Sequence, residues 1–287
     1  MLIKRILIIT IALMFFCCSE SKTTSNNTKP SKDLKPVIAF NNLTKNYNTW
    51  WSYHYHKIDL SKDFLAYDVD NTEIEKSEFL KRVMSGNYIV IEVKSKEIKT
   101  TAYKLFLLNE KTHKTIANTI KNTTATEYKY FKMEGLPFPK FNVTDINKNT
   151  YNNDILKGKL TVIKTWFIAC KPCVAEFPEL NKLVEDYQPN RNIQFLSLAL
   201  DKKEQLNKFL KKKSFKYNVI AEQKDLIENK LGLNVYPTHL IIDKKGNIEK
   251  VFNKAFNMIS YLNSKNILVK NDNSEKLAPP PPPPPPI

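Results

Sequence analysis

The sequence predicts an α/β protein in which helices flank a central mixed sheet, preceded by a smaller α+β region. Between residues 160 and 232, short apolar runs alternate with amphipathic segments of helical period, as in parallel strands covered by helices. Two further apolar runs within 238–252 flank a Lys245-Gly246-Asn247 turn, so a closing hairpin adds an antiparallel part. Residues 37–133 lack this regular alternation and predict a separate mixture of strands and helices.

Residues 1–18 resemble a bacterial lipoprotein-type signal peptide. A basic start precedes an apolar run at 6–16, which is shorter than the ~20 residues that a membrane span needs. The run ends at Cys17 and Cys18. Cleavage before Cys18 leaves a small residue at the preceding position, so Cys18 rather than Cys17 is the expected lipid-anchored residue. Bulky phenylalanines near the cleavage point depart from the usual pattern, and an ordinary secretory signal is the alternative. Both interpretations place the protein outside the cytoplasm.

Two segments of biased composition lie outside the predicted folded regions. Residues 19–36 are almost free of apolar side chains and predict a flexible tether. Residues 271–287 predict a disordered tail, in which the proline run 279–286 would form an extended polyproline II rod. A docking site for a proline-reading domain is the alternative interpretation of this run, and we assign it no function.

The region 37–133 shows strand and helix patterns but no chemical motif. The expected strands are TWWSYHYHKIDL (49–60), FLAYDVD (64–70), YIVIEVK (88–94) and TTAYKLFLL (100–108), and the expected helices are EIEKSEFLKRVMS (73–85) and HKTIANTIKNTTATEYKYF (113–131). His54 and His56 would alternate onto one face of the first strand. An exposed polar face is the favoured interpretation there, and a pair of metal ligands is the alternative.

The prolines of GLPFPKF (135–141) mark a boundary, and the region 134–270 follows. Its expected strands are 160–167, 193–201, 217–222 and the hairpin 238–252, and its expected helices are 173–187, 203–213, 224–232 and 255–265.

Cys170 and Cys173 carry the most specific chemical signal in the sequence. They would be the only cysteines of the mature chain if Cys18 is lipidated and Cys17 is removed. Cys170 lies between a predicted strand and a predicted helix. The free N–H groups and the dipole at a helix start stabilise a thiolate and lower its pKa. The spacing lets the two sulfurs form a disulfide, so a redox-active pair is predicted.

Other interpretations of the cysteine pair fit less well. Zinc needs four ligands, and the histidines at 54, 56, 113 and 239 show no paired spacing near Cys170. A structural staple around two residues would stabilise little, because closure entropy grows with loop length. We therefore expect no metal and no cofactor. The net charge of +16 raises nucleic acid as a partner, but the lysines are spread along the whole chain, and we expect no nucleic-acid binding.

The region 134–270 resembles the thioredoxin-fold domain of TlpA/ResA-like thiol–disulfide oxidoreductases. The motifs that match are Gly135 to Phe141, Leu156-Lys157-Gly158-Lys159, Trp166, Cys170-Lys171-Pro172-Cys173, Glu176-Phe177-Pro178, Tyr236-Pro237-Thr238, and Ile242-Asp243 with Gly246. They occur in the order and spacing of that family over about half of the chain.

The resemblance implies roles for single residues. Cys170 would be the exposed nucleophile and Cys173 the buried resolving thiol. Pro237 would be a cis-proline beside the cysteines that shapes the substrate groove, with an ordinary strand-opening proline as the alternative. Glu176 would assist proton transfer to or from the thiols, or else only stabilise the first turn of its helix.

Further implications concern two prolines and two departures from the family pattern. Pro172 would modulate the reduction potential, and Pro178 would kink the active-site helix. Ala169 stands where a tryptophan is usual, which puts the choice of partner in doubt. Lys164 stands where thioredoxins have a buried aspartate. We expect Lys164 either to turn away or to pair with Glu176, and our hypothesis is that the two side chains are close.

The sequence therefore predicts a membrane-anchored lipoprotein on the periplasmic side of the bacterial cell envelope that acts as a disulfide reductase. It would take electrons from a membrane thiol donor and pass them to an oxidised client protein, as the family does in cytochrome c maturation. One alternative is a partner-binding lipoprotein whose 37–133 module carries the function. Another is a thiol oxidase or peroxidase of the same superfamily.

Overall fold

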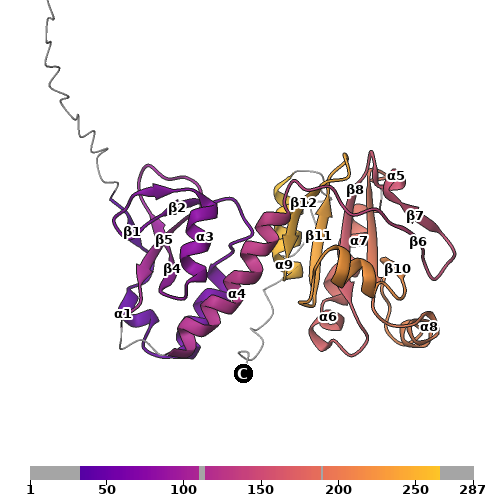
Figure 1. The fold of residues 1–287 in the computed structure, drawn as a ribbon, viewed down its shortest axis with the longest axis horizontal. Coiled ribbons are helices and arrows are strands. Elements are labelled where there is room, and N and C mark those ends of the chain that lie inside the picture. Colours follow the sequence, from indigo (N-terminus) through magenta and orange to yellow (C-terminus); the bar gives the residue numbers. More distant parts are fainter. Residues whose placement is uncertain (1–32, 110–113, 189, 266–287) are drawn as a thin grey trace, which may run out of the picture. The chain divides into compact units, whose positions relative to one another are not determined.

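Two five-stranded sheets form the framework of the protein, and a long helix lies between them in the sequence (Figure 1). The structure is a computed structural model that describes residues 33–109, 114–188 and 190–265. The described residues belong to one compact unit of the chain. Within them, no helix is both long enough and apolar enough to cross a membrane. The predicted signal peptide, most of the tether and the proline run lie outside the described residues.

The N-terminal region is an α+β unit, as predicted. Its sheet has the order β1-β4-β5-β2-β3. The strands are β1 (Lys35–Pro36), β2 (Leu65–Tyr67), β3 (Glu73–Ile74), β4 (Tyr88–Lys94) and β5 (Ala102–Leu107), and the helices are α1 (Phe40–Leu43), α2 (Tyr47–Lys57), α3 (Lys76–Met84) and α4 (Lys114–Met133). Phe79, Leu80 and Val83 recur at helical spacing on α3, and all three are buried in the core of this region.

The strand predicted over residues 49–60 is wrong, because most of this segment is helix α2. The Asn46 side chain accepts a hydrogen bond from the Thr49 backbone N–H at 2.9 Å and caps the helix start. Aromatic rings four residues apart then stack along the helix, as Trp50 and His54 do at 5.0 Å. The aromatic content had favoured a strand. His54 and His56 therefore lie on a helix, and the described residues contain no cluster of three metal-ligating side chains.

The second region forms a mixed sheet of order β10-β9-β8-β11-β12. Its strands are β8 (Leu160–Trp166), β9 (Ile193–Ala199), β10 (Asn218–Ile220), β11 (Thr238–Ile242) and β12 (Ile248–Phe252), and its helices are α5 (Asn153–Leu156), α6 (Lys171–Ala175), α7 (Phe177–Tyr187), α8 (Lys203–Leu210) and α9 (Ala255–Ser264). Strands β8, β9 and β10 pair in parallel, whereas β11 pairs antiparallel with β8 and β12. This topology is the thioredoxin fold, as predicted.

Every residue of β8 is buried, because helices cover both faces of the sheet. Val162 packs in one core cluster with apolar residues of α7 and α9. Ile163 packs in another with residues from the end of α4 and from the short helix at Asp225–Lys230. Side chains alternate between faces along a strand, so Lys164 lies on the face that α7 and α9 cover.

Three local features differ from the expected elements. A hairpin of β6 (Asn142–Thr144) and β7 (Thr150–Asn152) was not predicted from the sequence. The helix predicted over 224–232 is one turn of π-helix at Asp225–Lys230. The helix predicted over 173–187 is divided into α6 and α7 at Glu176, two residues before Pro178, as the kink prediction implied.

Helix α4 contributes to the cores of both regions. Ile116 and Ile120 near its start are buried in the N-terminal core. Tyr130 and Met133 near its end are buried in the core of the thioredoxin-fold region. The change of fold at residue 134 is therefore not a division between two independent hydrophobic cores.

Candidate active site

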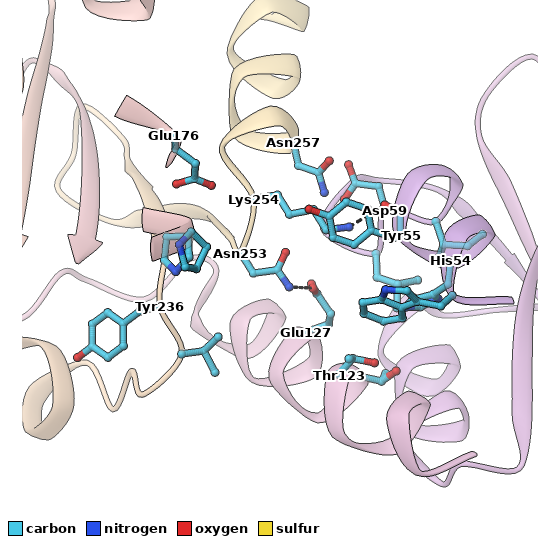
Figure 2. Close-up of a pocket in the computed structure, with 17 residues that line it drawn as sticks. His54, Tyr55, Asp59, Thr123, Glu127, Glu176, Tyr236, Asn253, Lys254 and Asn257 are labelled. Atoms are coloured by element: carbon cyan, nitrogen blue, oxygen red, sulfur yellow. Dashed lines mark hydrogen bonds between the residues drawn. The ribbon is translucent and has the colours of Figure 1, made fainter. Parts of the chain in front are cut away.

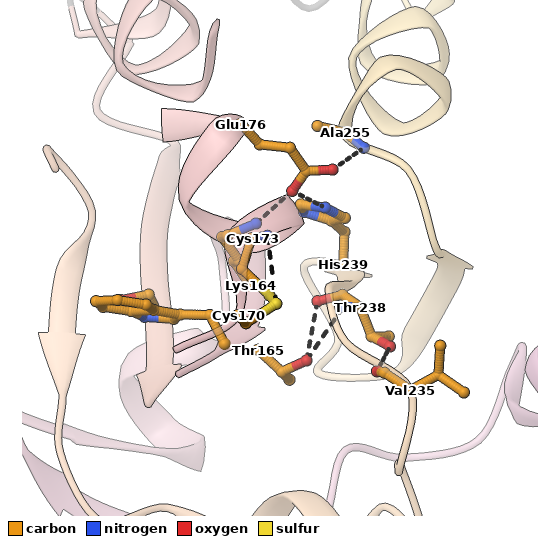
Figure 3. Close-up of polar contacts among 11 residues, drawn as sticks. Lys164, Thr165, Cys170, Cys173, Glu176, Val235, Thr238, His239 and Ala255 are labelled. Carbon is orange, nitrogen blue, oxygen red and sulfur yellow. Dashed lines mark hydrogen bonds and ion pairs between the residues drawn. A yellow bond between two sulfur atoms is a disulfide. The ribbon is translucent and has the colours of Figure 1, made fainter. Parts of the chain in front are cut away.

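The two cysteines lie where β8 gives way to α6, and they form a disulfide (Figure 3). Cys170 is the residue that caps α6, and its sulfur accepts a hydrogen bond from the Cys173 backbone N–H at 3.3 Å. Cys170 is 5 % exposed and Cys173 is 0 % exposed. The resemblance implied an exposed Cys170. Cys170 is the more accessible of the two cysteines, but both are buried in the oxidised protein.

Contacts behind the cysteines hold the active-site loop in place. The Ile168 backbone N–H donates a hydrogen bond to the Asp201 carboxylate at 2.7 Å, just beyond the end of β9. The Trp166 indole N–H donates to the Ser197 hydroxyl at 3.2 Å, and its ring meets Phe177 edge-on at 5.0 Å. The loop is thereby tied to both the sheet and α7.

Pro237 immediately precedes β11, the strand that pairs with β8, and the Tyr236–Pro237 peptide bond is cis, as predicted. Thr238, the next residue, is the first of β11 and exchanges hydrogen bonds with Thr165. Its backbone N–H donates to the Thr165 hydroxyl at 3.2 Å, and its carbonyl accepts from that hydroxyl at 3.3 Å. The Thr238 hydroxyl also contacts the Tyr130 hydroxyl at 2.7 Å. The proline loop is therefore fastened to β8 and to α4.

Lys164 and Glu176 form an ion pair, which confirms the hypothesis that they are close (Figure 3). His239 joins them, because it lies opposite Lys164 in the antiparallel pairing of β8 and β11. Its Nε2 is 3.1 Å from the same carboxylate oxygen. The other oxygen of Glu176 accepts a hydrogen bond from the Ala255 backbone N–H at 3.1 Å. We call Lys164, Glu176 and His239 the buried charge cluster.

The cluster keeps Glu176 ionised. Burial alone raises the pKa of this carboxyl, but His239 and Lys164 oppose it with their charges and hydrogen bonds, and the pKa falls to about 2. Burial lowers the pKa of Lys164, which Glu176 partly offsets. Burial also lowers the pKa of His239; Glu176 opposes this effect, and the charge of Lys164 adds to it. A neutral His239 ring can donate its Nε2–H to Glu176. Its Nδ1 is buried without a hydrogen-bond partner among the described residues.

Known proteins match this part of the chain. The AhpC/TSA family model matches residues 135–251. A thiol–disulfide oxidoreductase ResA of Bacillus cereus is 30 % identical over 119 residues, which cover 41 % of this chain and 68 % of the relative. The chain belongs to the ResA-like thiol–disulfide oxidoreductases. ResA of Geobacillus thermodenitrificans is 26 % identical over 118 residues, which cover 41 % of this chain and 67 % of that relative.

Solved structures are similar over the same region. The thioredoxin domain of a thiol–disulfide oxidoreductase from Bacteroides vulgatus is 20 % identical with a TM-score of 0.42, and covers 46 % of this chain and 96 % of its own. A thiol–disulfide oxidoreductase from Bacteroides fragilis is 17 % identical with a TM-score of 0.41. The match covers 45 % of this chain and 98 % of that protein. By its family and by the topology of its second sheet, the ResA-like protein is a thiol–disulfide oxidoreductase with a thioredoxin-fold region.

Two functional features of this ResA-like chain escaped the sequence analysis. His239 was noted only as one of four scattered histidines, and its strand register against Lys164 is what brings it to the site. The sequence signal that could have pointed to His239 was its position two residues after the predicted cis-proline, Pro237. The second feature is a pocket of about 270 Å³ (Figure 2), and Pro172, which lies between the two cysteines in the sequence, is one of its lining residues. Its lining comes from both regions, so no local motif marks it.

Proposed function

We propose that the protein is an extracytoplasmic disulfide reductase that passes electrons to oxidised cysteines of an envelope client. The observation that carries this proposal is the Cys170–Cys173 disulfide at the start of α6, together with cis-Pro237 just before β11, the strand that pairs with β8. The same two residues would serve a thiol oxidase, and the direction depends on the reduction potential of the pair.

The reaction is an exchange of disulfides. The Cys170 thiolate attacks one sulfur of the client disulfide, which forms a mixed disulfide and releases the other client cysteine as a thiolate. Cys173, once deprotonated, attacks the Cys170 sulfur, forms the Cys170–Cys173 disulfide and releases the second client thiolate. The client gains two electrons and two protons. A dithiol donor, for which we propose a membrane thiol carrier, returns the pair to its reduced form.

The residues around the sulfurs would support this exchange. The Cys173 backbone N–H, 3.3 Å from the Cys170 sulfur, is placed to stabilise a thiolate there. Pro237 would shape the groove that receives the client. Glu176 was expected to assist proton transfer or to act electrostatically. Its low pKa and its three donors favour the electrostatic role, in which it holds the Lys164 ammonium in place behind the cysteines.

For the location, we propose a lipoprotein of the bacterial cell envelope, anchored through Cys18. The support is the sequence of residues 1–18, with a basic start, a short apolar run and the cysteines. Cytochrome c maturation is one process in which oxidised client cysteines must be reduced. We propose it as a setting for this activity, without assigning a client.

Equilibration with glutathione tests the direction and the roles of the two cysteines together. We expect the reduced protein to form the Cys170–Cys173 disulfide with a midpoint below about −200 mV, nearer to thioredoxin at about −270 mV than to DsbA at about −120 mV. The Cys173→Ser variant should stop as a mixed disulfide with one glutathione on Cys170, measured by mass spectrometry.

The converse variant is the matched control. Cys170→Ser should acquire glutathione much more slowly, because Cys173 is 0 % exposed. A midpoint near about −120 mV would overturn the reductase direction. Equal glutathione adducts on the two variants would overturn the assignment of Cys170 as the attacking residue.

A further inference from the structure

The pocket shown in Figure 2 has walls from both regions of the chain. Pro172, within the Cys-Lys-Pro-Cys motif, and cis-Pro237 line one side. Trp51 and Tyr55 of α2 and Glu127 of α4 line the other. A polypeptide whose cysteine reaches Cys170 must pass these prolines, so a neighbouring side chain of that polypeptide lies within reach of the pocket.

Several hydrogen-bond acceptors of the pocket are unused. Asp59 is 8 % exposed, and its Oδ2 atom is buried without a hydrogen-bond partner among the described residues. That oxygen has an ion-pair contact with the half-exposed Lys62 at 3.5 Å. The Thr124 hydroxyl is also buried and unpaired among the described residues. Glu127 accepts one hydrogen bond through Oε1, from the Asn253 amide at 2.8 Å. Protein atoms enclose the Asp59 and Thr124 oxygens, so the partly exposed Glu127 carboxylate is the acceptor that a donor-bearing group in the pocket can reach.

The remaining lining suits the stem of an amphipathic cation. Trp51, Tyr55, Ile58 and Leu60 supply aromatic and aliphatic surface. The chain's own Lys254 shows that this chemistry holds an ammonium ion. Its Nζ lies 3.8 Å from the centre of the Tyr55 ring and donates to the Tyr55 carbonyl at 2.8 Å. Cations bind well where an apolar stem can pack and the charged head meets acceptors.

One carboxyl group of the pocket, that of Glu127, is available to pair with an additional cation. Among the lining residues, Asp59, Glu127 and Glu176 carry carboxyl groups, and Lys254 carries an ammonium. The Glu176 carboxylate is already paired with Lys164 outside the lining. Asp59 is in contact with Lys62, which leaves Glu127 as the lining carboxyl group without an ion pair among the described residues. Burial raises the pKa of Glu127 to about 7, and the charge of Asp59 adds to this rise. Lys254, Lys76 and the Asn253 hydrogen bond oppose it.

We infer that this pocket, the client pocket, binds a lysine or arginine side chain that lies beside the reactive cysteine of the client polypeptide. The inference rests on the proposed function, since it names the class of client that the same cysteines would reduce. It also gives the N-terminal region a role, because α2 and α4 supply the aromatic and acidic side of the pocket. The region would select clients while Cys170 and Cys173 perform the exchange.

Two matched peptide disulfides test the inference on the full-length protein. They are alike except beside one cysteine, where one has lysine and the other has norleucine, which keeps the stem and lacks the ammonium. We expect the reduced protein to reduce the lysine peptide about tenfold faster in kcat/KM, the factor expected for one charged hydrogen bond. Each rate is divided by the rate of the same peptide with dithiothreitol, which removes intrinsic differences between the disulfides.

Variants then assign the preference to the client pocket. Glu127→Gln keeps the size of the side chain and an oxygen for Asn253, and it should reduce the preference to about twofold or less. Glu185→Gln, which changes an exposed carboxylate outside the pocket, should keep the full preference. A Glu127→Gln variant with the full preference would overturn the assignment to this pocket. If the unaltered protein reduces both peptides at equal rates, after division by the dithiothreitol rates, the inference is wrong.

A small neutral substrate separates this inference from the proposed function. Hydroxyethyl disulfide has no side chain to enter the client pocket. If the protein reduces it but shows no preference for the lysine peptide, only the client pocket is wrong. If the protein reduces neither hydroxyethyl disulfide nor either peptide, the proposed function fails as well.

The preference should also depend on pH. Glu127 binds a cation only when ionised, and its pKa of about 7 means that it takes up a proton below neutrality. The ratio of lysine to norleucine rates should therefore rise between pH 6 and pH 8. Dividing by the norleucine rate cancels the pH dependence of the cysteines. A ratio that falls or stays constant over this range would contradict a role for the Glu127 carboxylate.

Discussion

Lys164 is a charged residue in the middle of a buried strand, at 0 % exposure. A lone ammonium would be very costly there, so its partner Glu176 must be present and ionised. Glu176 in turn meets His239 and the Ala255 backbone N–H. The position of Lys164 six residues before Cys170 indicated a charge near the sulfurs. The third member of the cluster depends on strand register, which the sequence pattern does not specify.

Lys164→Met tests the buried charge cluster. The change removes the nearest cation from Glu176, and we expect a loss of about 3–5 kcal/mol in unfolding free energy at pH 8. The pKa of His239 should rise, because the charge of Lys164 no longer opposes protonation of the ring. A protonated His239 then pairs with Glu176, so the loss should be smaller at pH 5 than at pH 8. Denaturant unfolding at both pH values and an NMR titration of His239 measure these effects.

Lys216→Met is the control for this prediction. Lys216 forms an exposed ion pair with Glu185, and its removal should change the free energy of unfolding by no more than about 0.5 kcal/mol. The coupling within the cluster would be refuted by an unchanged His239 pKa in Lys164→Met.

Helices and strands with a clear periodicity of apolar residues were predicted well. Elements whose form depends on a cap or on other side-chain contacts were not. The strands β8, β9 and β11 and the helices α3 and α4 lie where the apolar pattern placed them. Helix α2 was predicted as a strand, because its aromatic residues favour strands and its Asn46 cap is a weak local signal. The π-helical turn at Asp225–Lys230 has no distinct sequence signature.

Two glycines offer a matched test of element packing. Gly86 and Gly158 both have φ of +80°, which disfavours any residue with a side chain. A Cβ on Gly86 would lie 3.0 Å from the Ala117 carbonyl oxygen of α4, whereas a Cβ on Gly158 meets nothing within 4 Å. Gly158→Ala should therefore cost about 1–2 kcal/mol in unfolding free energy from backbone strain alone.

Gly86→Ala should cost more, by about 1–3 kcal/mol, because α3 and α4 must also move apart. Denaturant unfolding of the two variants compares them directly. Equal losses would mean that the close approach of the α3 end to α4 adds nothing to stability.

For the whole molecule, the sequence predicted two regions and their fold classes but not how they depend on each other. The composition changes at GLPFPKF, and this change led to a boundary at residue 134. The contacts extend across it. Lys250 of β12 forms ion pairs with Asp63 and Glu134 at 2.9 Å each, and Tyr130 meets Thr238. Such pairings are between residues far apart in sequence, and periodicity carries no information about them.

Truncation measures this dependence. A chain that begins at residue 134 lacks Tyr130 and Met133, which are buried in the core of the thioredoxin-fold region. We expect it to be less stable by about 3 kcal/mol or more than a chain that begins at residue 126 and keeps both. Neither chain contains the apolar residues Ile116 and Ile120, so the comparison isolates the end of α4. Equal unfolding midpoints and slopes would show that the core is complete without it.

Helix α4 also limits how the redox region can be reused. Suppose that the segment from residue 134 onward is fused to another protein. The fusion would contain the two cysteines and the cis-proline, but it would lack Tyr130, whose hydroxyl contacts Thr238. A recipient chain would need to supply its own aromatic residue and helix at that place. The junction between the two regions therefore lies inside helix α4, and an exchange that keeps this contact requires a crossover upstream of Tyr130 rather than at the proline-rich segment.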